Sequence, residues 1–347
     1  MRPFRSKSFL ARRAHVVLGT VMFALSACRA APPTLSGAPA GAPPLPPAPW
    51  LGLIGEYGPD SAVRIVLERD GQLMVHDTAS EAALVALNDT MFRVSRLGDL
   101  VTFTLGARGR AERMTLAALP LARRAVGPET GNQLTIVPVR PIPELRREAL
   151  ASTPPVERGP FLPSDLVELT SLDSTIHLEI RYATSNNLFG TPFYTQARAF
   201  LQRPAAEAVV RASAALRARG YGLLVHDGYR PWYVTKMFWD ASPPEKHVFV
   251  ADPASGSKHN RGAAVDLTLY DRATGAPVEM PSTYDETSPR AYPNYPGGTS
   301  RQRWHRDLLR RAMEAEGYTV YEAEWWHFDY KDWKRYAIGN VDFQRLR

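Results

Sequence analysis

Two short segments near the C-terminal end of the chain carry residues whose types and spacing suit a zinc-activated water. The first reads SKHNRGAAVD and supplies His259 and Asp266, and the second reads EWWH and supplies Glu324 and His327. A catalytic zinc takes imidazole nitrogens and carboxylate oxygens from three protein ligands and keeps a fourth position open for water. His259, Asp266 and His327 are therefore the candidate ligands, and Glu324 is the candidate general base.

Each segment alone also has a purely structural interpretation. A lone His and Asp pair at this spacing is more often two unrelated residues, and Gly262 would have to turn the chain before a strand points Asp266 inward. Glu324 and His327 lie in an aromatic segment, where an unpartnered carboxylate or imidazole is costly to bury. They would share one face of a helix but not of a strand. The alternative is a Glu324 paired with an arginine and a His327 bound to a backbone carbonyl.

A third polar group follows an apolar run that is predicted to be a buried strand. The segment HDGYRP places Arg230 at the end of that strand, immediately before a helix expected to begin at Pro231. A guanidinium in that place could stabilise the oxyanion that forms when an activated water attacks an amide carbonyl. The alternative is a local ion pair between Arg230 and Asp227.

The elements that position these residues are preceded by a region of a different kind. Residues 50–140 contain short runs that alternate apolar and polar side chains, the period of half-buried β-strands. Asp70-Gly71 separates two of these runs and favours a hairpin. Further runs lie at 91–94, 101–105 and 134–139. A small antiparallel β domain is predicted, and its Gly-Glu-Tyr start resembles the lipocalin-like modules appended to some extracellular hydrolases.

The candidate site falls in a second predicted domain at 165–347, after a proline-rich stretch at 141–164 that is predicted to be a linker with one short helix at 144–151. Two helices are expected, at 204–219 and 301–316, each followed by a glycine. The expected strands lie at 176–182, 222–226, 263–270 and 319–330. Because helices and strands do not alternate regularly, the predicted fold class is α+β.

The first 27 residues are predicted to be a signal peptide. Five basic side chains precede an uncharged run that is short for a membrane span. The run ends in Leu-Ser-Ala-Cys28, which resembles the lipobox of bacterial lipoproteins, in which the cysteine is lipidated. Cys28 is the only cysteine, which excludes an internal disulfide framework and a cysteine-rich zinc site. The alternative is ordinary cleavage near Ala27 or Ala31.

Residues 28–49, which are rich in proline and alanine, are predicted to be a tether between the lipidated Cys28 and the folded part. Either form of processing places the mature protein outside the cytoplasm, in the periplasm or the cell envelope. Loss of the five basic side chains of residues 1–27 would leave a formal net charge of +2 rather than +7. This small charge, without a cluster of Lys and Arg interleaved with aromatics, argues against nucleic-acid binding.

The order, wording and spacing of four segments resemble the zinc D-alanyl-D-alanine dipeptidases of the vancomycin-resistance type. That family shares a fold with D,D-carboxypeptidases and with the hedgehog signalling domain. The resemblance covers residues 165–347, and the β domain at 50–140 lies outside it. The four segments are RYAT at 181–184, GYRP at 228–231, the Ser-x-His-x-x-Gly-x-Ala-x-Asp pattern at 257–266, and EWWH at 324–327.

The resemblance implies a role for each residue of the candidate site. It implies one zinc ion per chain bound by His259, Asp266 and His327, with Glu324 as the catalytic base and Arg230 as the group that stabilises the transition state. It also implies that Ser257 contacts the substrate and that Asp285 binds the substrate's ammonium group, with Glu286 as the alternative. His226, His247 and His305 match no ligand position.

The resemblance further implies a zinc metallopeptidase that splits a short dipeptide such as D-Ala-D-Ala and serves cell-wall peptide metabolism. A carboxylate for a free ammonium favours dipeptides over polymeric peptidoglycan stems. Two alternatives stay open: a D,D- or L,D-carboxypeptidase acting on stem peptides, and a non-catalytic, zinc-stabilised binding protein. A binding protein has no need of the base Glu324, which argues against that second alternative.

Overall fold

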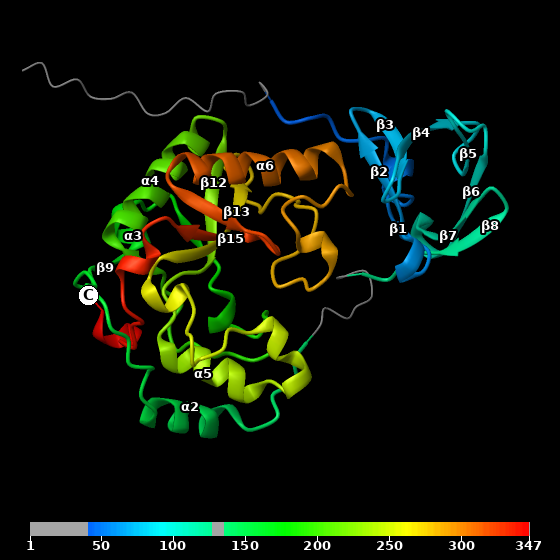
Figure 1. Ribbon diagram of the computed structural model, residues 1–347. Helices are drawn as coiled ribbons and strands as arrows, with labels where there is room; N and C mark the ends of the chain where they lie inside the picture. The colour runs from blue at the N-terminus through cyan, green and yellow to red at the C-terminus, as the bar shows by residue number, and fades with distance from the viewer. Residues whose placement is uncertain (1–40, 127–134, 347) are drawn as a thin grey trace, which may run out of the picture. The chain divides into compact units, whose positions relative to one another are not determined.

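Eight short strands form one antiparallel sheet in sequence order at the N-terminal end of the computed structural model, which describes residues 41–126 and 135–346 (Figure 1). These strands, which follow the short helix α1 (Ala48–Leu51), are β1 (Gly55–Tyr57), β2 (Arg64–Arg69), β3 (Gln72–His76), β4 (Glu81–Ala86), β5 (Met91–Val94), β6 (Leu100–Leu105), β7 (Ala111–Leu116) and β8 (Leu119–Ala122). The hairpin predicted at Asp70-Gly71 joins β2 to β3, and both turn residues have positive φ, as a tight two-residue turn requires. Tyr57 bridges Arg123, so the last strand returns to the first.

A second sheet of five strands carries the candidate site. Its order is β10-β12-β13-β15-β14, and only the β10–β12 pair is parallel. The strands are β10 (His177–Leu178), β12 (Tyr221–Asp227), β13 (Ala264–Asp271), β14 (Tyr318–Tyr321) and β15 (Glu324–Tyr330), and a separate pair is formed by β9 (Leu166–Glu168) and β11 (Phe200–Gln202). The mixture of helices with mostly antiparallel strands confirms the α+β class predicted for this part of the chain.

Five helices lie among the described residues of this part of the chain, and two of them pack on the five-stranded sheet. The five helices are α2 (Ile142–Ala151), α3 (Leu169–Leu172), α4 (Arg203–Arg217), α5 (Trp232–Ala241) and α6 (Ser300–Ala315). In α4, Ala205, Val209, Ala212 and Leu216 recur every three or four residues and are all fully buried. Figure 1 shows α4 and α6 beside the central strands, and both helices contact the sheet as well as each other.

The segment between the two sheets differs from its prediction. Residues 135–139 form no strand, because Ile136 is buried in the core of the second sheet and its N–H donates to the Leu188 carbonyl instead of a ladder. The short helix predicted within the proline-rich stretch at 141–164 is present as α2, and it packs on α5 and buries Leu145 and Ala149 in the same core. The prolines of this stretch therefore flank a helix that belongs to the core of the second sheet.

The strand predicted at 176–182 is shorter in the structure, and the predicted signal peptide lies outside the described residues. The strand expected at 176–182 is reduced to β10 followed by a single turn of 3₁₀-helix at Arg181–Ala183. The signal peptide, Cys28 and most of the predicted tether lie outside the described residues. Within those residues, no helix is both long enough and apolar enough to cross a membrane.

One glycine decides how the chain enters β13. Gly262 has φ of 63°, a left-handed conformation that side chains with a Cβ rarely adopt. A Cβ on this residue would lie 2.5 Å from Cδ2 of Leu166, which is closer than packed atoms approach. Gly262 therefore allows the turn that separates His259 from Asp266.

We expect Gly262→Ala to lower the free energy of unfolding by about 1–3 kcal/mol, because it adds backbone strain and a steric contact at one position. Gly275→Ala is the matched control, since Gly275 also has positive φ (73°) but nothing lies within 4 Å of its added Cβ. Urea unfolding of both variants checks this. Equal losses in the two variants would show that the contact with Leu166 contributes nothing.

Candidate metal centre

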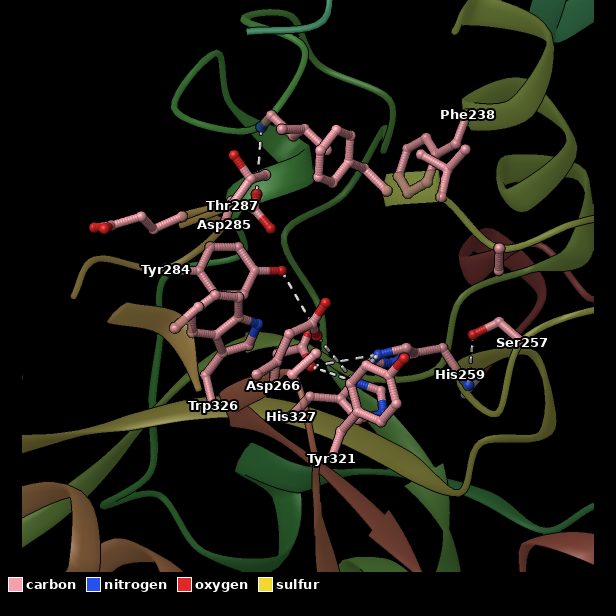
Figure 2. Close-up of a pocket in the computed structure, with 18 of the residues that line it drawn as sticks. Phe238, Ser257, His259, Asp266, Tyr284, Asp285, Thr287, Tyr321, Trp326 and His327 are labelled. Atoms are coloured by element: carbon pink, nitrogen blue, oxygen red, sulfur yellow. Dashed lines mark hydrogen bonds and ion pairs between the residues drawn. The ribbon is translucent and has the colours of Figure 1, made fainter. Parts of the chain in front are cut away.

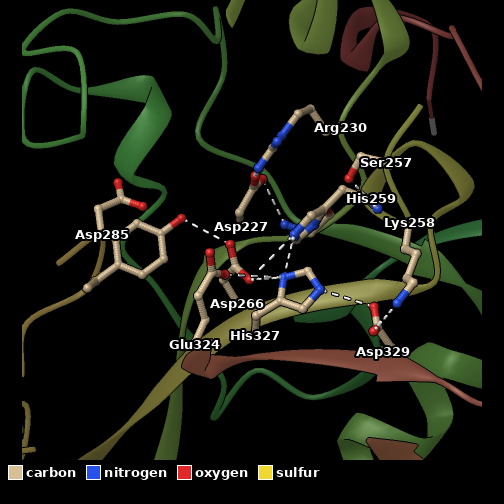
Figure 3. Close-up of polar contacts among 12 residues, drawn as sticks. Asp227, Arg230, Ser257, Lys258, His259, Asp266, Asp285, Glu324, His327 and Asp329 are labelled. Carbon is tan, nitrogen blue, oxygen red and sulfur yellow. Dashed lines mark hydrogen bonds and ion pairs between the residues drawn. The ribbon is translucent and has the colours of Figure 1, made fainter. Parts of the chain in front are cut away.

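Neighbouring strands bring two of the predicted ligands together. In the β13–β15 ladder Asp266 is directly opposite His327, so their side chains point to the same face of the sheet. His259 approaches from the 3₁₀ turn at His259–Arg261 that precedes Gly262. Figure 3 shows the three side chains converging on one point. The sequence expectation that these residues meet is thus realised in the fold.

The three ligand atoms lie at separations that suit a tetrahedral ion. Nε2 of His259 is 3.2 Å from Nδ1 of His327 and 3.4 Å from Oδ1 of Asp266, and the last two atoms are 2.9 Å apart. Zinc ligands at 2.0–2.1 Å in a tetrahedron are separated from each other by about 3.3 Å. Two imidazole nitrogens and one carboxylate oxygen with this spacing fit a zinc ion that keeps its fourth position open.

Second contacts hold both imidazoles in the orientation that a metal needs. Nδ1 of His259 lies 2.7 Å from the Gly228 carbonyl oxygen, and Nε2 of His327 lies 3.0 Å from Oδ1 of Asp329. The Gly228 carbonyl and the Asp329 carboxylate accept hydrogen bonds, so each holds a proton on the ring nitrogen that it contacts. The other nitrogen of each imidazole, which faces the cluster, is then unprotonated and can bind a metal. Lys258 forms an ion pair with Asp329 and keeps that carboxylate in place.

Asp266 and His327 shift each other's pKa values. Burial alone would raise the pKa of Asp266, but His259 and His327 hold it well below its usual range. Burial opposes protonation of His327, yet hydrogen bonds to Asp266 and Asp329 raise its pKa to about 10. The site thus attracts positive charge, as a cation-binding site should.

Glu324 reaches the ligands through an irregularity in β15. Residues three apart on a regular strand face opposite sides, but the β14–β15 register shifts between Val320 paired with Phe328 and Tyr321 paired with Glu324. This bulge lets Glu324 Oε2 lie 3.9 Å from Nδ1 of His327. Burial in the pocket and the nearby Asp266 raise the pKa of Glu324, and a higher pKa makes this carboxylate a better proton acceptor.

Arg230 both lines the pocket and forms the predicted local ion pair. Its guanidinium donates two hydrogen bonds to Oδ2 of Asp227, at 2.7 and 3.1 Å. Tyr194 donates to the other oxygen of Asp227, and the aromatic ring of Phe238 lies 4.8 Å from the guanidinium carbon. The ion pair therefore holds Arg230 rigidly at the pocket wall, so the two interpretations of this residue are compatible.

Asp285 and Glu286, the two candidates for binding a substrate's ammonium group, have different hydrogen-bond partners. Tyr182 Oη donates to Asp285 Oδ2 at 3.2 Å, and burial together with Asp266 and Glu324 raises the pKa of Asp285 to about 8. Glu286 instead accepts hydrogen bonds from Ser288 and the Thr283 backbone N–H. Within residues 41–126 and 135–346, no Lys, Arg or His side chain forms an ion pair with Asp285.

One cavity of about 570 Å³ joins all of these groups. Figure 2 shows Ser257 on the side of His259, and Asp285 with Tyr284 on the opposite side. Ser257 Oγ accepts a hydrogen bond from the His259 backbone N–H. The residues predicted for the site line this cavity without exception: Arg230, Ser257, His259, Asp266, Asp285, Glu324 and His327.

Sequence reasoning missed three supporting residues. Asp329 follows His327 by two positions, so the strand period could have placed it on the same face. Asp227 was considered only as an alternative partner that would exclude a role for Arg230. Tyr284 donates from Oη to Oδ2 of Asp266 at 3.0 Å, and no pattern in the sequence points to this contact between a loop and a distant strand.

His226, His247 and His305, which match no ligand position in the sequence, are not part of the cluster. His226 is buried, and burial lowers its pKa to about 4. His305 lies near the Glu279 carbonyl and Tyr221, and His247 stacks on Trp239. Within residues 41–126 and 135–346, the only cluster of three or more ligand-type side chains close enough to share a metal ion is His259, Asp266 and His327.

Comparison with known proteins identifies relatives of the second sheet region. The family model described as D-ala-D-ala dipeptidase matches residues 163–345. A D-alanyl-D-alanine dipeptidase from Escherichia coli is 32% identical over 166 residues, covering 48% of this chain and 84% of the relative. Its counterpart from Enterococcus faecium is 33% identical over 198 residues, covering 51% and 98%. The strands β1–β8 lie outside the family match.

We expect Asp329→Asn to weaken zinc binding about 10–100-fold, because an amide holds the Nε2 proton of His327 less strongly than a carboxylate does. Competition with a chromophoric zinc chelator measures the affinity directly. Asp332→Asn, in the turn after β15, is the matched control and should bind zinc as the unmodified protein does. Unchanged affinity in Asp329→Asn would contradict this role.

Proposed function

The chain belongs to the D-ala-D-ala dipeptidase family, and from that premise we propose that it hydrolyses D-Ala-D-Ala, or a similar short dipeptide, with one zinc ion held by His259, Asp266 and His327. The observation that carries this proposal is the common cavity. It joins a three-ligand cluster, a carboxylate with a raised pKa and a fixed guanidinium. A protein that used zinc only for stability would have no use for the last two groups.

The reaction follows from what each side chain can do in this cavity. Zinc, when bound, lowers the pKa of a coordinated water and polarises a carbonyl oxygen. Glu324 takes the proton from the attacking water and later gives it to the departing amine, which needs a pKa near the working pH. Arg230, held by Asp227, offers its guanidinium to the negative charge that develops on the carbonyl oxygen.

The substrate's charged ends fit opposite sides of the cavity. We assign its ammonium to Asp285, because Glu286 already accepts hydrogen bonds from Ser288 and Thr283. A cation beside Asp285 would lower the pKa that burial and neighbouring carboxylates raise. Ser257 lies on the other side of the cluster, where it is placed to contact the leaving residue. This arrangement favours a free dipeptide over a stem peptide whose N-terminus is blocked.

The finer fold and the cellular location belong to the same proposal. The mixed five-stranded sheet with its zinc cluster is consistent with the hedgehog and D,D-peptidase fold, and the curled β1–β8 sheet is consistent with a lipocalin-like module. We further propose that the protein is a periplasmic or cell-envelope lipoprotein that is anchored to a membrane through Cys28. Mass spectrometry of the N-terminal peptide from native membranes would test the anchor.

Glu324→Gln should retain zinc but lose at least about 100-fold in kcat, since the amide accepts no proton from water. Metal analysis and steady-state kinetics on the same preparation check both halves of this statement. His259→Ala is the comparison variant and should lose zinc together with activity. Near-normal turnover by Glu324→Gln would contradict the assignment of Glu324 as the general base.

Release of D-alanine from D-Ala-D-Ala tests the proposed reaction directly. We expect release by protein lacking residues 1–28, its loss after treatment with a chelator, and its recovery on addition of zinc. A stem pentapeptide ending in D-Ala-D-Ala, assayed in parallel, should be hydrolysed far more slowly. Preferred hydrolysis of the pentapeptide would make the protein a carboxypeptidase, and no hydrolysis of either would favour a binding protein.

A further inference from the structure

Helix α6 begins with a charge pattern that is unfavourable by itself. Its first turn contains no acidic residue but does contain Arg301 and Arg303, although a helix N-terminus carries partial positive charge. Thr299 and Gln302 form a capping box that satisfies two backbone groups but adds no negative charge. An anion supplied from elsewhere in the protein would offset this positive charge.

Glu68 of strand β2 supplies this anion from the first sheet. Its Oε2 accepts a hydrogen bond from the Ser300 backbone N–H at 2.7 Å, and its Oε1 accepts one from the Gly71 backbone N–H at 2.7 Å. The Glu68 main chain adds two more contacts, from its N–H to the Gly298 carbonyl and from Arg303 to its own carbonyl. Glu68 is 2% exposed, so this charge is buried at the start of α6.

A second carboxylate of the first sheet makes a similar contact. Tyr295 donates from Oη to Oε1 of Glu56 in β1 at 2.9 Å, and both side chains are buried. The other oxygen of Glu56 is held by Arg124 at 3.2 Å. A buried hydroxyl and a buried carboxylate both lose free energy if they are separated without new partners. The two sheets are therefore joined by polar contacts that are costly to break.

Both contacts act on the segment that also builds one side of the catalytic cavity. Residues 281–299, here called the bridging segment, end at the cap of α6. Near its start, Tyr284 donates to Asp266 and Asp285 accepts from Tyr182. Near its end, Tyr295 and Gly298 contact the first sheet. The bridging segment thus connects β1 and β2 to the proposed ammonium site.

Asp285 depends on external support because its backbone is strained. It has φ of 61°, a left-handed conformation that costs a non-glycine residue about 1–3 kcal/mol. Such a conformation persists only where the surrounding structure holds it. Arg290 supports it within the segment by donating to the Pro281 carbonyl, and Glu56 and Glu68 support it from outside.

We propose that the β1–β8 sheet is a positioning element of the active site, in which Glu56 and Glu68 hold the bridging segment so that Asp285 meets the substrate's ammonium group. The substrate-binding part of this statement rests on the proposed dipeptidase function. Neither glutamate touches the substrate, so both are positioning residues. The first sheet, which the family match does not include, then contributes to the recognition of a free N-terminus.

Tyr295→Phe and Glu56→Gln test the contact in the full-length zinc-loaded protein. Tyr295→Phe removes one hydroxyl and keeps the ring in its packing. Each variant should raise KM for D-Ala-D-Ala about five- to tenfold while kcat changes less than about twofold, since only substrate positioning is lost. Glu112→Gln, an exposed glutamate of strand β7, is the matched control and should leave both constants unchanged.

Hydrogen–deuterium exchange supplies a readout that does not depend on activity. In Tyr295→Phe and Glu56→Gln, exchange should accelerate in the bridging segment and stay unchanged at 257–266, where two ligands lie. Glu68→Gln should accelerate exchange in the first turn of α6 as well. If the unmodified protein released no D-alanine, the proposed function would fail while this measurement would still test the contact.

The proposal is overturned if exchange in the bridging segment and KM both stay at the unmodified values in Tyr295→Phe and Glu56→Gln. It is also overturned if exchange rises uniformly along the chain with KM unchanged, because that result describes a contact that only stabilises the fold. Failure of Glu68→Gln to fold does not affect the test, since Tyr295→Phe alters no charge.

Discussion

The pairing of β13 with β15 is the constraint on which the site depends. It sets Asp266 opposite His327, and these two residues define the place that His259 and Glu324 must reach. His259 reaches it because Gly262 turns the chain, and Glu324 reaches it because β15 is bulged. A slip of one residue in this register would turn the ligands to opposite faces of the sheet.

The same pairing concentrates negative charge, and the rest of the site compensates for it. Carboxylates of Asp266, Asp285 and Glu324 surround one cavity, and burial together with their proximity raises the pKa of the last two. Arg230 and Lys258 are paired with Asp227 and Asp329, so neither cation neutralises the three that face the cavity. Under the proposed function, a zinc ion and the substrate's ammonium group would be the two positive charges that this cavity accepts.

The sequence allowed the meeting of His259, Asp266 and His327 and the α+β class to be predicted, because short motifs and hydrophobic periods are local. It did not allow the choice between Asp285 and Glu286, since that choice depends on which carboxylate Ser288 and Thr283 occupy. It indicated a short helix in the proline-rich stretch but not how that helix packs, because proline spacing does not show that Leu145 is buried against a distant helix. On a regular strand, Glu324 and His327 would face opposite sides of the sheet. The bulge in the β14–β15 pair brings them together, and the sequence does not show this bulge.

The central claim is that three protein ligands hold one zinc ion with an open position beside Glu324. A crystal of the zinc-loaded protein, measured with anomalous scattering at the zinc absorption edge, tests it most directly. The account predicts a single peak within about 2.0–2.2 Å of Nε2 of His259, an oxygen of Asp266 and Nδ1 of His327, with a water as fourth ligand facing Glu324. A fourth protein ligand in that position, or no peak at these three residues, would contradict it.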